Sequence, residues 1–285
     1  SAGAPDRPSD QRKGRTVFGY AVPAVAGGSD SDTVLGLFHR NLQVTDLDLV
    51  VDKDATPGEP TLNLRNRDLR FAKLDRTDLH QADMTGSDLE GASLIAADLR
   101  GVWMQCGNLD ELLLTDDRRA ARCASARSAN FFKARLSDAK MAGIDLRGAR
   151  LEEAQLDGAV LAYGVMIATD FAGARLDRAN LGSAALQGAN FLLASLQGAD
   201  LSGAKLHLAD FANAGLQGAN LTLANLEGAV LRDAELEGAN MQMSRLHGAD
   251  LRGSKMQGAD LAGAAIWRTL PPGGESSAFS DMSQI

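Results

Sequence analysis

Two cysteines, Cys106 and Cys123, carry the most reactive chemistry in this 285-residue chain. They flank a break in the otherwise regular pattern of the sequence. One interpretation is a disulfide that staples the broken segment, which would require an oxidising compartment. The other interpretation is two unrelated thiols. Zinc binding is not indicated, because the sequence has no CxxC pair and no histidine close to either cysteine.

Histidines and carboxylates are the other groups that could do chemistry. Four histidines are scattered along the chain: His39, His80, His207 and His247. The last two are expected to be exposed at corners of the fold. Outward carboxylates recur at fixed spacing, and we interpret them as a solvated ladder on a convex surface. The sequence holds no nucleophile elbow, phosphate loop or metal-spacing motif, so we expect no enzyme activity, catalytic residue, metal or cofactor.

The elements that carry these residues are defined by a period of five. From Phe131 to Ile266 a large apolar residue recurs at every fifth position for 28 consecutive repeats. A small residue, usually Ala, lies two positions before it, and Asp or Asn often lies between, as in Ala199-Asp200-Leu201. This period fits neither the 3.6-residue turn of a helix nor the two-residue repeat of a strand, and it indicates a repeat architecture.

A period of five is explained if each unit is one side of a square coil. Alternate positions of an extended segment point the same way, so the large residue and the Ala both face inward and the Asp or Asn faces outward. The two remaining residues form the corner. Four sides close a coil of 20 residues, and coils stack at about 4.8 Å through backbone hydrogen bonds.

Sorting the units over four faces sharpens this prediction. All four phenylalanine centres fall on one face and predict an internal aromatic column with a gap at Leu151: Phe131, Phe171, Phe191 and Phe211. Glycine is concentrated at the second corner residue of two opposite faces. We therefore expect type II turns, which need a positive φ, at those two corners and turns that tolerate side chains at the other two.

The domain organisation follows from where the period holds. A weaker run with central residues from Leu64 to Leu114 precedes the main run, and 17 positions separate Leu114 from Phe131, which shifts the phase by two residues. The intervening segment is predicted to be a bulged loop or a short outward helix. The predicted boundaries are a flexible segment 1–37, an N-terminal cap and loop 38–62, a first coil run 63–114, an interruption 115–129, a main β-helix 130–267 and a tail 268–285.

The units resemble the A(D/N)LXX motif of the pentapeptide repeat family, as shown by Ala189-Asn190-Phe191, Ala209-Asp210-Phe211, Ala249-Asp250-Leu251 and Ala259-Asp260-Leu261. The resemblance implies an all-β, right-handed quadrilateral β-helix. The passages 63–72 and 267–272 are similar to parts of larger proteobacterial pentapeptide proteins that have membrane-spanning segments outside the repeat. Because the chain does not begin with Met, we expect a processed or excised piece of such a protein.

Charge tests one function that the family implies. The family includes quinolone-resistance proteins that imitate DNA and bind gyrase through an acidic rod. The chain has a net charge of −8, but residues 131–266 hold 15 acidic and 12 basic residues, a net charge of only −3. A DNA mimic should concentrate negative charge along its rod, and net acidity also argues against direct nucleic-acid binding.

These observations favour a non-enzymatic scaffold or protein-interaction domain whose partner the sequence does not name. The alternatives are a DNA-mimicking, gyrase-binding protein and an enzyme with its site at the break or in the N-terminal segment. A candidate interaction surface consists of large apolar residues at second corner positions: Leu193, Leu208, Leu223 and Met243.

Further partners and the compartment are expectations of the same kind. A second copy of the chain could bind through the coil ends, where backbone groups are unpaired. Membrane contact is expected only through segments outside this chain. The predicted location is the cytoplasm or a membrane of a bacterium, with periplasmic exposure if Cys106 and Cys123 pair.

Overall fold

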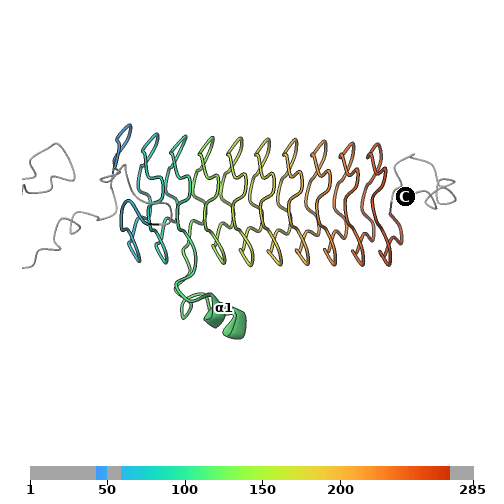
Figure 1. Ribbon diagram of the computed structural model, residues 1–285, viewed down its shortest axis with the longest axis horizontal. Coiled ribbons are helices and arrows are strands. Elements are labelled where there is room, and N and C mark those ends of the chain that lie inside the picture. Colours follow the sequence, from blue (N-terminus) through green and yellow to red (C-terminus); the bar gives the residue numbers. More distant parts are fainter. Residues whose placement is uncertain (1–42, 50–58, 270–285) are drawn as a thin grey trace, which may run out of the picture. The chain divides into compact units, whose positions relative to one another are not determined.

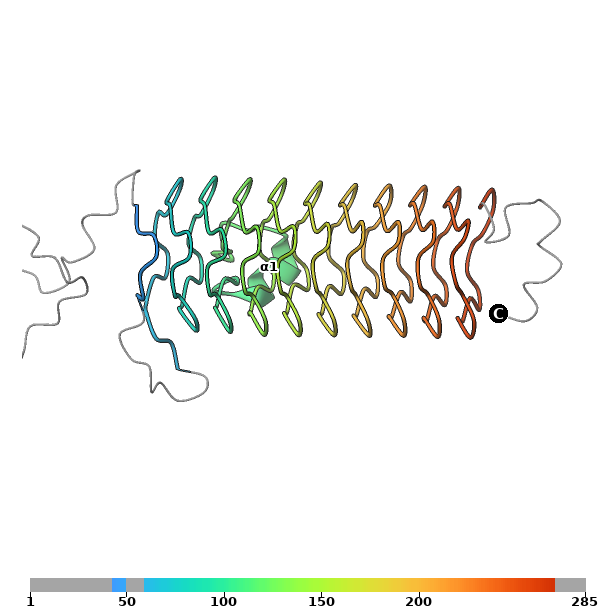
Figure 2. The same ribbon diagram turned by 90° about the horizontal axis from the view of Figure 1, so that it is seen from above.

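The computed structural model describes residues 43–49 and 59–269. Residues 59–269 form a stack of four-sided coils, from which one short helix projects (Figures 1 and 2). The predicted flexible segment 1–37 and the part of the predicted tail beyond Thr269 lie outside the described residues. Within the described part of the chain, no helix has the length and apolar character needed to cross a bilayer.

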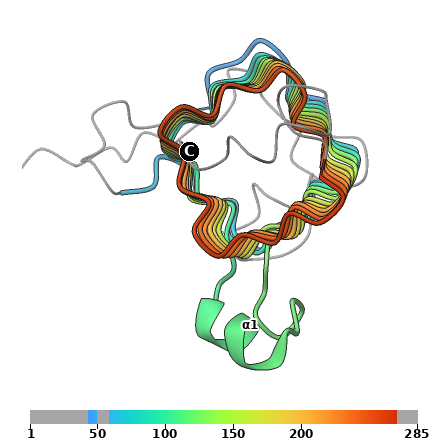
Figure 3. The same ribbon diagram turned by 90° about the vertical axis from the view of Figure 1, so that its right-hand side faces the viewer.

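Each coil is joined to the next by regular parallel pairing, as in Asp170 with Asn190 and Asn190 with Asp210. The backbone hydrogen bonds run both ways along the stack. Leu181 N donates to Asp200 O at 2.7 Å, and Asp200 N donates to Ala179 O at 2.9 Å. Viewed along the stack, successive coils superimpose on one four-sided outline (Figure 3). The predicted all-β, right-handed quadrilateral β-helix is thereby confirmed.

The interior follows the predicted pattern of one large and one small residue per side. Phe191 and the Ala189 that precedes it are both fully buried. The ring centroids of Phe171 and Phe191 lie 4.9 Å apart and those of Phe191 and Phe211 4.7 Å apart, with nearly parallel rings. These distances match the spacing of stacked strands. The predicted phenylalanine column is therefore confirmed for these three rings.

The prediction of two kinds of corner is wrong. The second corner residue has a positive φ on all four faces, whether it is a glycine such as Gly158 (φ 68°) or a side-chain-bearing residue such as Lys133 (φ 59°) or Leu193 (φ 60°). A backbone bond closes the corners, as where Ala134 N donates to Phe131 O at 2.9 Å. The coil geometry therefore imposes the left-handed conformation everywhere and overrides its cost for a non-glycine residue, about 1–2 kcal/mol.

The first coil run ends earlier than predicted. Leu109 and Leu114 were expected to be coil centres, but both lie in helix α1, Leu109–Thr115, and Leu114 is 84% exposed. The predicted boundary at 114 is therefore wrong, because the last inward residue before the interruption is Met104. A five-residue spacing between two helical leucines imitated the coil period by coincidence.

The N-terminal part of the stack contains a partial coil. Gln43 pairs with Lys73 and Asp48 with Asp78, thirty positions apart, whereas regular coils pair positions twenty apart. Val44 and Leu49 are buried. Leu47, between them in the sequence, is 43% exposed.

Candidate functional site at the interrupted coil

The interruption is an excursion of the chain from an otherwise continuous β-helix. Asp88 pairs with Ser125 and Trp103 with Lys140, so the chain between these paired positions is longer than one regular coil. It leaves the coil after Cys106 and returns at Cys123, where these two residues pair in antiparallel fashion. We call residues 107–123 the excursion. It was predicted at 115–129, and the structure moves both ends toward the N-terminus because Ala124 and Ala126 already occupy buried coil positions.

Helix α1 forms within the excursion because its ends are capped. The side chain of Asn108 accepts a hydrogen bond from Glu111 N at 3.1 Å, which is typical of an N-cap. Asp110 and Glu111 in the first turn suit the positive end of the helix dipole. At the other end, Asp116 adopts a left-handed φ of 54° and donates its N–H to Leu112 O. These local signals account for a short helix in which Leu112 is the buried residue.

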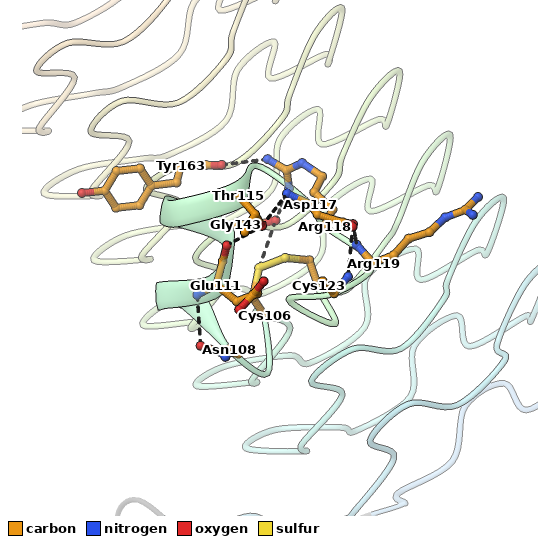
Figure 4. Close-up of a disulfide and its surroundings, with 11 residues drawn as sticks. Cys106, Asn108, Glu111, Thr115, Asp117, Arg118, Arg119, Cys123, Gly143 and Tyr163 are labelled. Carbon is orange, nitrogen blue, oxygen red and sulfur yellow. Dashed lines mark hydrogen bonds between the residues drawn. A yellow bond between two sulfur atoms is a disulfide. The ribbon is translucent and has the colours of Figure 1, made fainter.

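A small apolar cluster holds the base of the excursion. The structure pairs Cys106 with Cys123 as a disulfide (Figure 4). Leu112 and Ala121 are buried against it. The cluster packs against Gly143 in the next coil. A β-carbon at Gly143 would lie 2.3 Å from Cys106 Sγ and 2.8 Å from Leu112 Cδ2. The absence of a side chain at Gly143 therefore makes room for the cluster.

Arg118 ties the excursion to two successive coils. Its guanidinium donates hydrogen bonds to the backbone oxygens of Gly143 and Tyr163, the latter at 3.0 Å (Figure 4). Gly143 and Tyr163 lie on the same edge of the stack in neighbouring coils, since Gly143 N donates to the oxygen of Ala162. Burial lowers the pKa of Arg118 below its ordinary value, although an arginine remains protonated in proteins. The excursion is thus anchored by a disulfide, an apolar cluster and a half-buried cation.

Two hollows lie beside the excursion. The first is a cleft of about 550 Å³, and its lining includes five arginines and two aspartates: Arg118, Arg119, Arg122, Arg127, Arg147, Asp88 and Asp145. We call it the arginine cleft. The second is a groove of about 290 Å³ bordered by Leu112, Leu113, Tyr163 and Lys205, among others. We call it the helix groove. Arg118 lies at the boundary between the two.

Sequence reasoning missed the arginine cleft, although a signal was present. The segment 116–127 is rich in arginine, with Arg118, Arg119, Arg122 and Arg127, but in the sequence these residues indicated only a loop or a short helix. The cleft forms because the backbone of the excursion turns sharply at 118–122, where Arg122 N donates to Arg119 O at 3.1 Å and Cys123 N donates to Arg118 O at 3.0 Å. Because of this turn, Arg118, Arg119 and Arg122, which are close together in the sequence, line the same cleft as Arg147.

The predicted interaction residues lie at corners with left-handed φ, and each is 63–69% exposed: Leu193, Leu208, Leu223 and Met243. They do not form one surface. Leu223 and Met243 occupy the same edge in neighbouring coils, where Leu223 N donates to the oxygen of Gln242. Leu193 and Leu208 lie on two other edges. The structure therefore brings together only two of the four.

The histidines and carboxylates do not converge. His80 Nδ1 lies 2.7 Å from Asp78 Oδ1, and His207 and His247, which were predicted to be exposed, are half-buried. His39 lies outside the described residues. Asp200 accepts hydrogen bonds from Ser202 N and from Asn220 Nδ2, both at 3.0 Å, so the ladder residues order their own corners. Across residues 43–49 and 59–269, no group of three or more His, Cys, Asp or Glu side chains is arranged to hold a metal.

Comparison with known families identifies the class of protein. The model of the family described as "Pentapeptide repeats" matches this chain in eight copies. The matched residues are 63–101, 129–162, 154–191, 174–213, 189–228, 209–248 and 229–265. The matched residues cover more than half of the chain. The protein therefore belongs to the pentapeptide repeat family.

Individual proteins are less similar. The chain has 26% sequence identity with HetL, a pentapeptide repeat protein involved in heterocyst differentiation regulation from the cyanobacterium Nostoc sp. strain PCC 7120; the match covers 82% of this chain and 90% of HetL, with a TM-score of 0.44. A pentapeptide repeat protein of the Arabidopsis thaliana thylakoid lumen has 38% identity over 34% of this chain and 67% of its own, with a TM-score of 0.33. QnrB1, a plasmid-mediated fluoroquinolone resistance protein, has 19% identity; the match covers 78% of this chain and 91% of QnrB1, with a TM-score of 0.45. No curated protein matches the chain.

Proposed function

We propose that the protein is a non-enzymatic scaffold that binds a partner protein through helix α1 and the helix groove beside it. The observation that carries the proposal is the exposure of large apolar side chains there. Leu113 is 52% exposed, Leu114 84% and Tyr163 40%. Single exposed apolar residues are ordinary, but these three gather around one projecting element.

The anchors of the excursion make this arrangement suitable for binding. The disulfide, the buried Leu112 and the hydrogen bonds of Arg118 hold the base of α1, so little conformational entropy is lost when a partner docks. Interfaces obtain most of their binding energy from a few apolar or aromatic anchors. Leu114 and Tyr163 are of this kind, and the helix groove between α1 and the coils offers a recess for an apolar side chain of the partner.

The test compares two matched double variants in pull-downs from extracts of the cells that make the protein. Leu113→Glu with Leu114→Glu removes the apolar surface of α1, and Leu193→Glu with Leu208→Glu places the same charges on two distant corners. We expect a protein that binds the wild type and the corner variant but binds the α1 variant at least roughly tenfold more weakly. Equal binding to all three proteins, or loss only with the corner variant, would reject the α1 surface.

The alternative of a DNA-mimicking, gyrase-binding rod is disfavoured by ion pairs on the coils. Several carboxylates of the coils are paired with cations, which reduces the negative charge that the rod presents. Asp98 is paired with Arg135 at 3.1 Å, Asp157 with Arg175 at 3.1 Å, and Glu235 with Lys255 at 2.8 Å. A supercoiling assay with a quinolone tests this alternative directly, and protection of gyrase by the protein would restore it.

We also propose that the protein works in an oxidising compartment. The support is the pairing of Cys106 with Cys123, since disulfides persist in such compartments and are rare where thiols are kept reduced. Thiol alkylation of the protein in freshly lysed cells, with and without prior reduction, tests this. Modification of both cysteines without reduction would contradict the proposal.

A further inference from the structure

The arginine cleft has a charge opposite to that of the chain as a whole. Its lining carries five arginines against two aspartates, whereas the chain has a net charge of −8. Like charges brought together in a cleft raise the local potential and attract a counter-ion. The charge of the cleft therefore differs in sign from the net charge of the chain, and this difference calls for an explanation.

The arginines of the cleft divide into two groups. Three have structural partners: Arg118 donates to backbone oxygens, Arg127 lies 2.9 Å from Glu90, and Arg147 forms a two-armed pair with Asp145. The guanidinium groups of Arg119 and Arg122 have no ion-pair or hydrogen-bond partner among residues 43–49 and 59–269. These two exposed cations are therefore free to bind a ligand.

Buried polar atoms of the cleft also lack partners. Ser125 Oγ and Arg127 Nε are shielded from solvent and form no hydrogen bond within the part of the chain that the structure describes. Ser125 and Arg127 both line the cleft. An unsatisfied buried donor costs free energy comparable to a lost hydrogen bond. These groups lie in the wall that also carries Arg119 and Arg122, so the cleft is polar as well as positively charged.

We propose that the arginine cleft binds a small soluble anion that carries two or more phosphoryl groups, with Arg119 and Arg122 as its principal ligands. Guanidinium groups match phosphate oxygens through paired N–H donors. The cleft volume of about 550 Å³ lies within the range of small-molecule sites. Five arginines line this one cleft, whereas residues 131–266 carry a net charge of −3, so the positive charge suits a small anion better than a long polyanion or an anionic bilayer. This site lies across Arg118 from the helix groove and does not depend on the proposed protein partner.

Titration calorimetry with inorganic tripolyphosphate at low and at physiological ionic strength tests the proposal. The wild type is expected to bind one equivalent saturably, and Arg119→Gln with Arg122→Gln is expected to raise the Kd roughly tenfold or more. The matched control is Arg178→Gln. Like Arg122, Arg178 is exposed and has a left-handed φ, 58° against 51°, but it lies on the regular coils. The control should change the Kd by less than about twofold.

Two further arms separate the sources of an anion. Citrate supplies carboxylates in place of phosphoryl groups, and equal affinity for citrate would overturn the phosphoryl assignment. Vesicles of phosphatidylcholine with phosphatidic acid supply a phosphate headgroup, and sedimentation with them that the double variant abolishes would overturn the assignment to a soluble ligand. The site itself would be overturned if tripolyphosphate gave no saturable heat. It would also be overturned if Arg178→Gln lost as much affinity for tripolyphosphate as the double variant. Thermal unfolding of each variant establishes that it is folded.

Discussion

Cys106 Sγ lies 3.6 Å from the carbonyl oxygen of Gly143, in a position that a side chain at Gly143 would block. The two residues are far apart in the sequence, yet this contact decides where the excursion rests on the β-helix. The glycine has a left-handed φ of 72°, so it meets a conformational and a spatial requirement at once.

Substitution at Gly143 should therefore displace the excursion. Gly143→Ala places a β-carbon 2.3 Å from Cys106 Sγ in addition to the left-handed φ, which alone costs about 1–2 kcal/mol. Gly203→Ala is the matched control, because Gly203 has a φ of 64° and its β-carbon would meet nothing closer than Ser183 Oγ at 3.5 Å. We expect faster hydrogen exchange at residues 107–123 in Gly143→Ala only. Equal exchange in both variants would show that the contact does not matter.

Loss of the disulfide should loosen the excursion without unfolding the β-helix. Cys106 and Cys123 are separated by 17 positions in the sequence, and for loops of this length a disulfide contributes about 3 kcal/mol. We expect Cys106→Ser with Cys123→Ser to expose residues 107–123 to limited proteolysis. Stability in a repeat protein is close to a nearest-neighbour sum, so coils beyond about residue 190 should retain their hydrogen-exchange protection. Collapse of protection along the whole stack would contradict this.

The phenylalanine column should tolerate leucine better than alanine. Phe191 is fully buried and stacks on both Phe171 and Phe211. Phe191→Ala leaves a cavity and should cost about 3–5 kcal/mol. Phe191→Leu should cost clearly less, because Leu151 already occupies the same inward position in another coil and is fully buried. Chemical denaturation checks this order, and the exposed Leu193→Ala, expected within about 0.5 kcal/mol of the wild type, is the control.

The ion pairs of Asp250 should make stability depend on pH. Hydrogen bonds from the Arg252 side chain are the main cause that holds the pKa of Asp250 well below its ordinary value, and Arg232 contributes in the same direction. Because the folded pKa is depressed, the stabilisation is complete above the ordinary pKa of about 4 and is lost as pH falls below it. Asp250→Asn should therefore destabilise by about 1.5–3 kcal/mol at pH 7, and the difference from the wild type should shrink below pH ~4.

Asp210→Asn is the control for that pH dependence. Asp210 Oδ1 accepts a hydrogen bond from Ala212 N at 2.9 Å, and Asn190, one coil away, makes the equivalent bond to Leu192 N at 3.0 Å. Asparagine is therefore already used at this position of the ladder. Thermal unfolding between pH 3 and 7 should show little difference between Asp210→Asn and the wild type. A deficit of Asp250→Asn that stayed constant over this range would refute the assigned linkage.

The sequence alone determined how the rod is built. In the units from Phe131 onward, the large residue and the small residue two before it face inward, and the residue between them faces outward. This local spacing determines the coil, its stacking and the position of each Phe. The period could do this because each coil contacts only its neighbours, and a rule that holds for one coil holds for the next. The same reasoning failed at the corners. A preference for glycine shows where a positive φ is relieved of its cost, but the backbone adopts a positive φ at the other corners as well.

Only the tertiary structure decided what happens at the interruption. Leu109 and Leu114 keep the five-residue spacing, yet the cap at Asn108 and the cluster around Leu112 place them in α1. The pairing of Cys106 with Cys123 and the convergence of Arg119, Arg122 and Arg147 depend on how the excursion folds back onto coils that follow it in sequence. Contacts between segments of unlike structure have no period, and so they leave no repeating signal in the sequence.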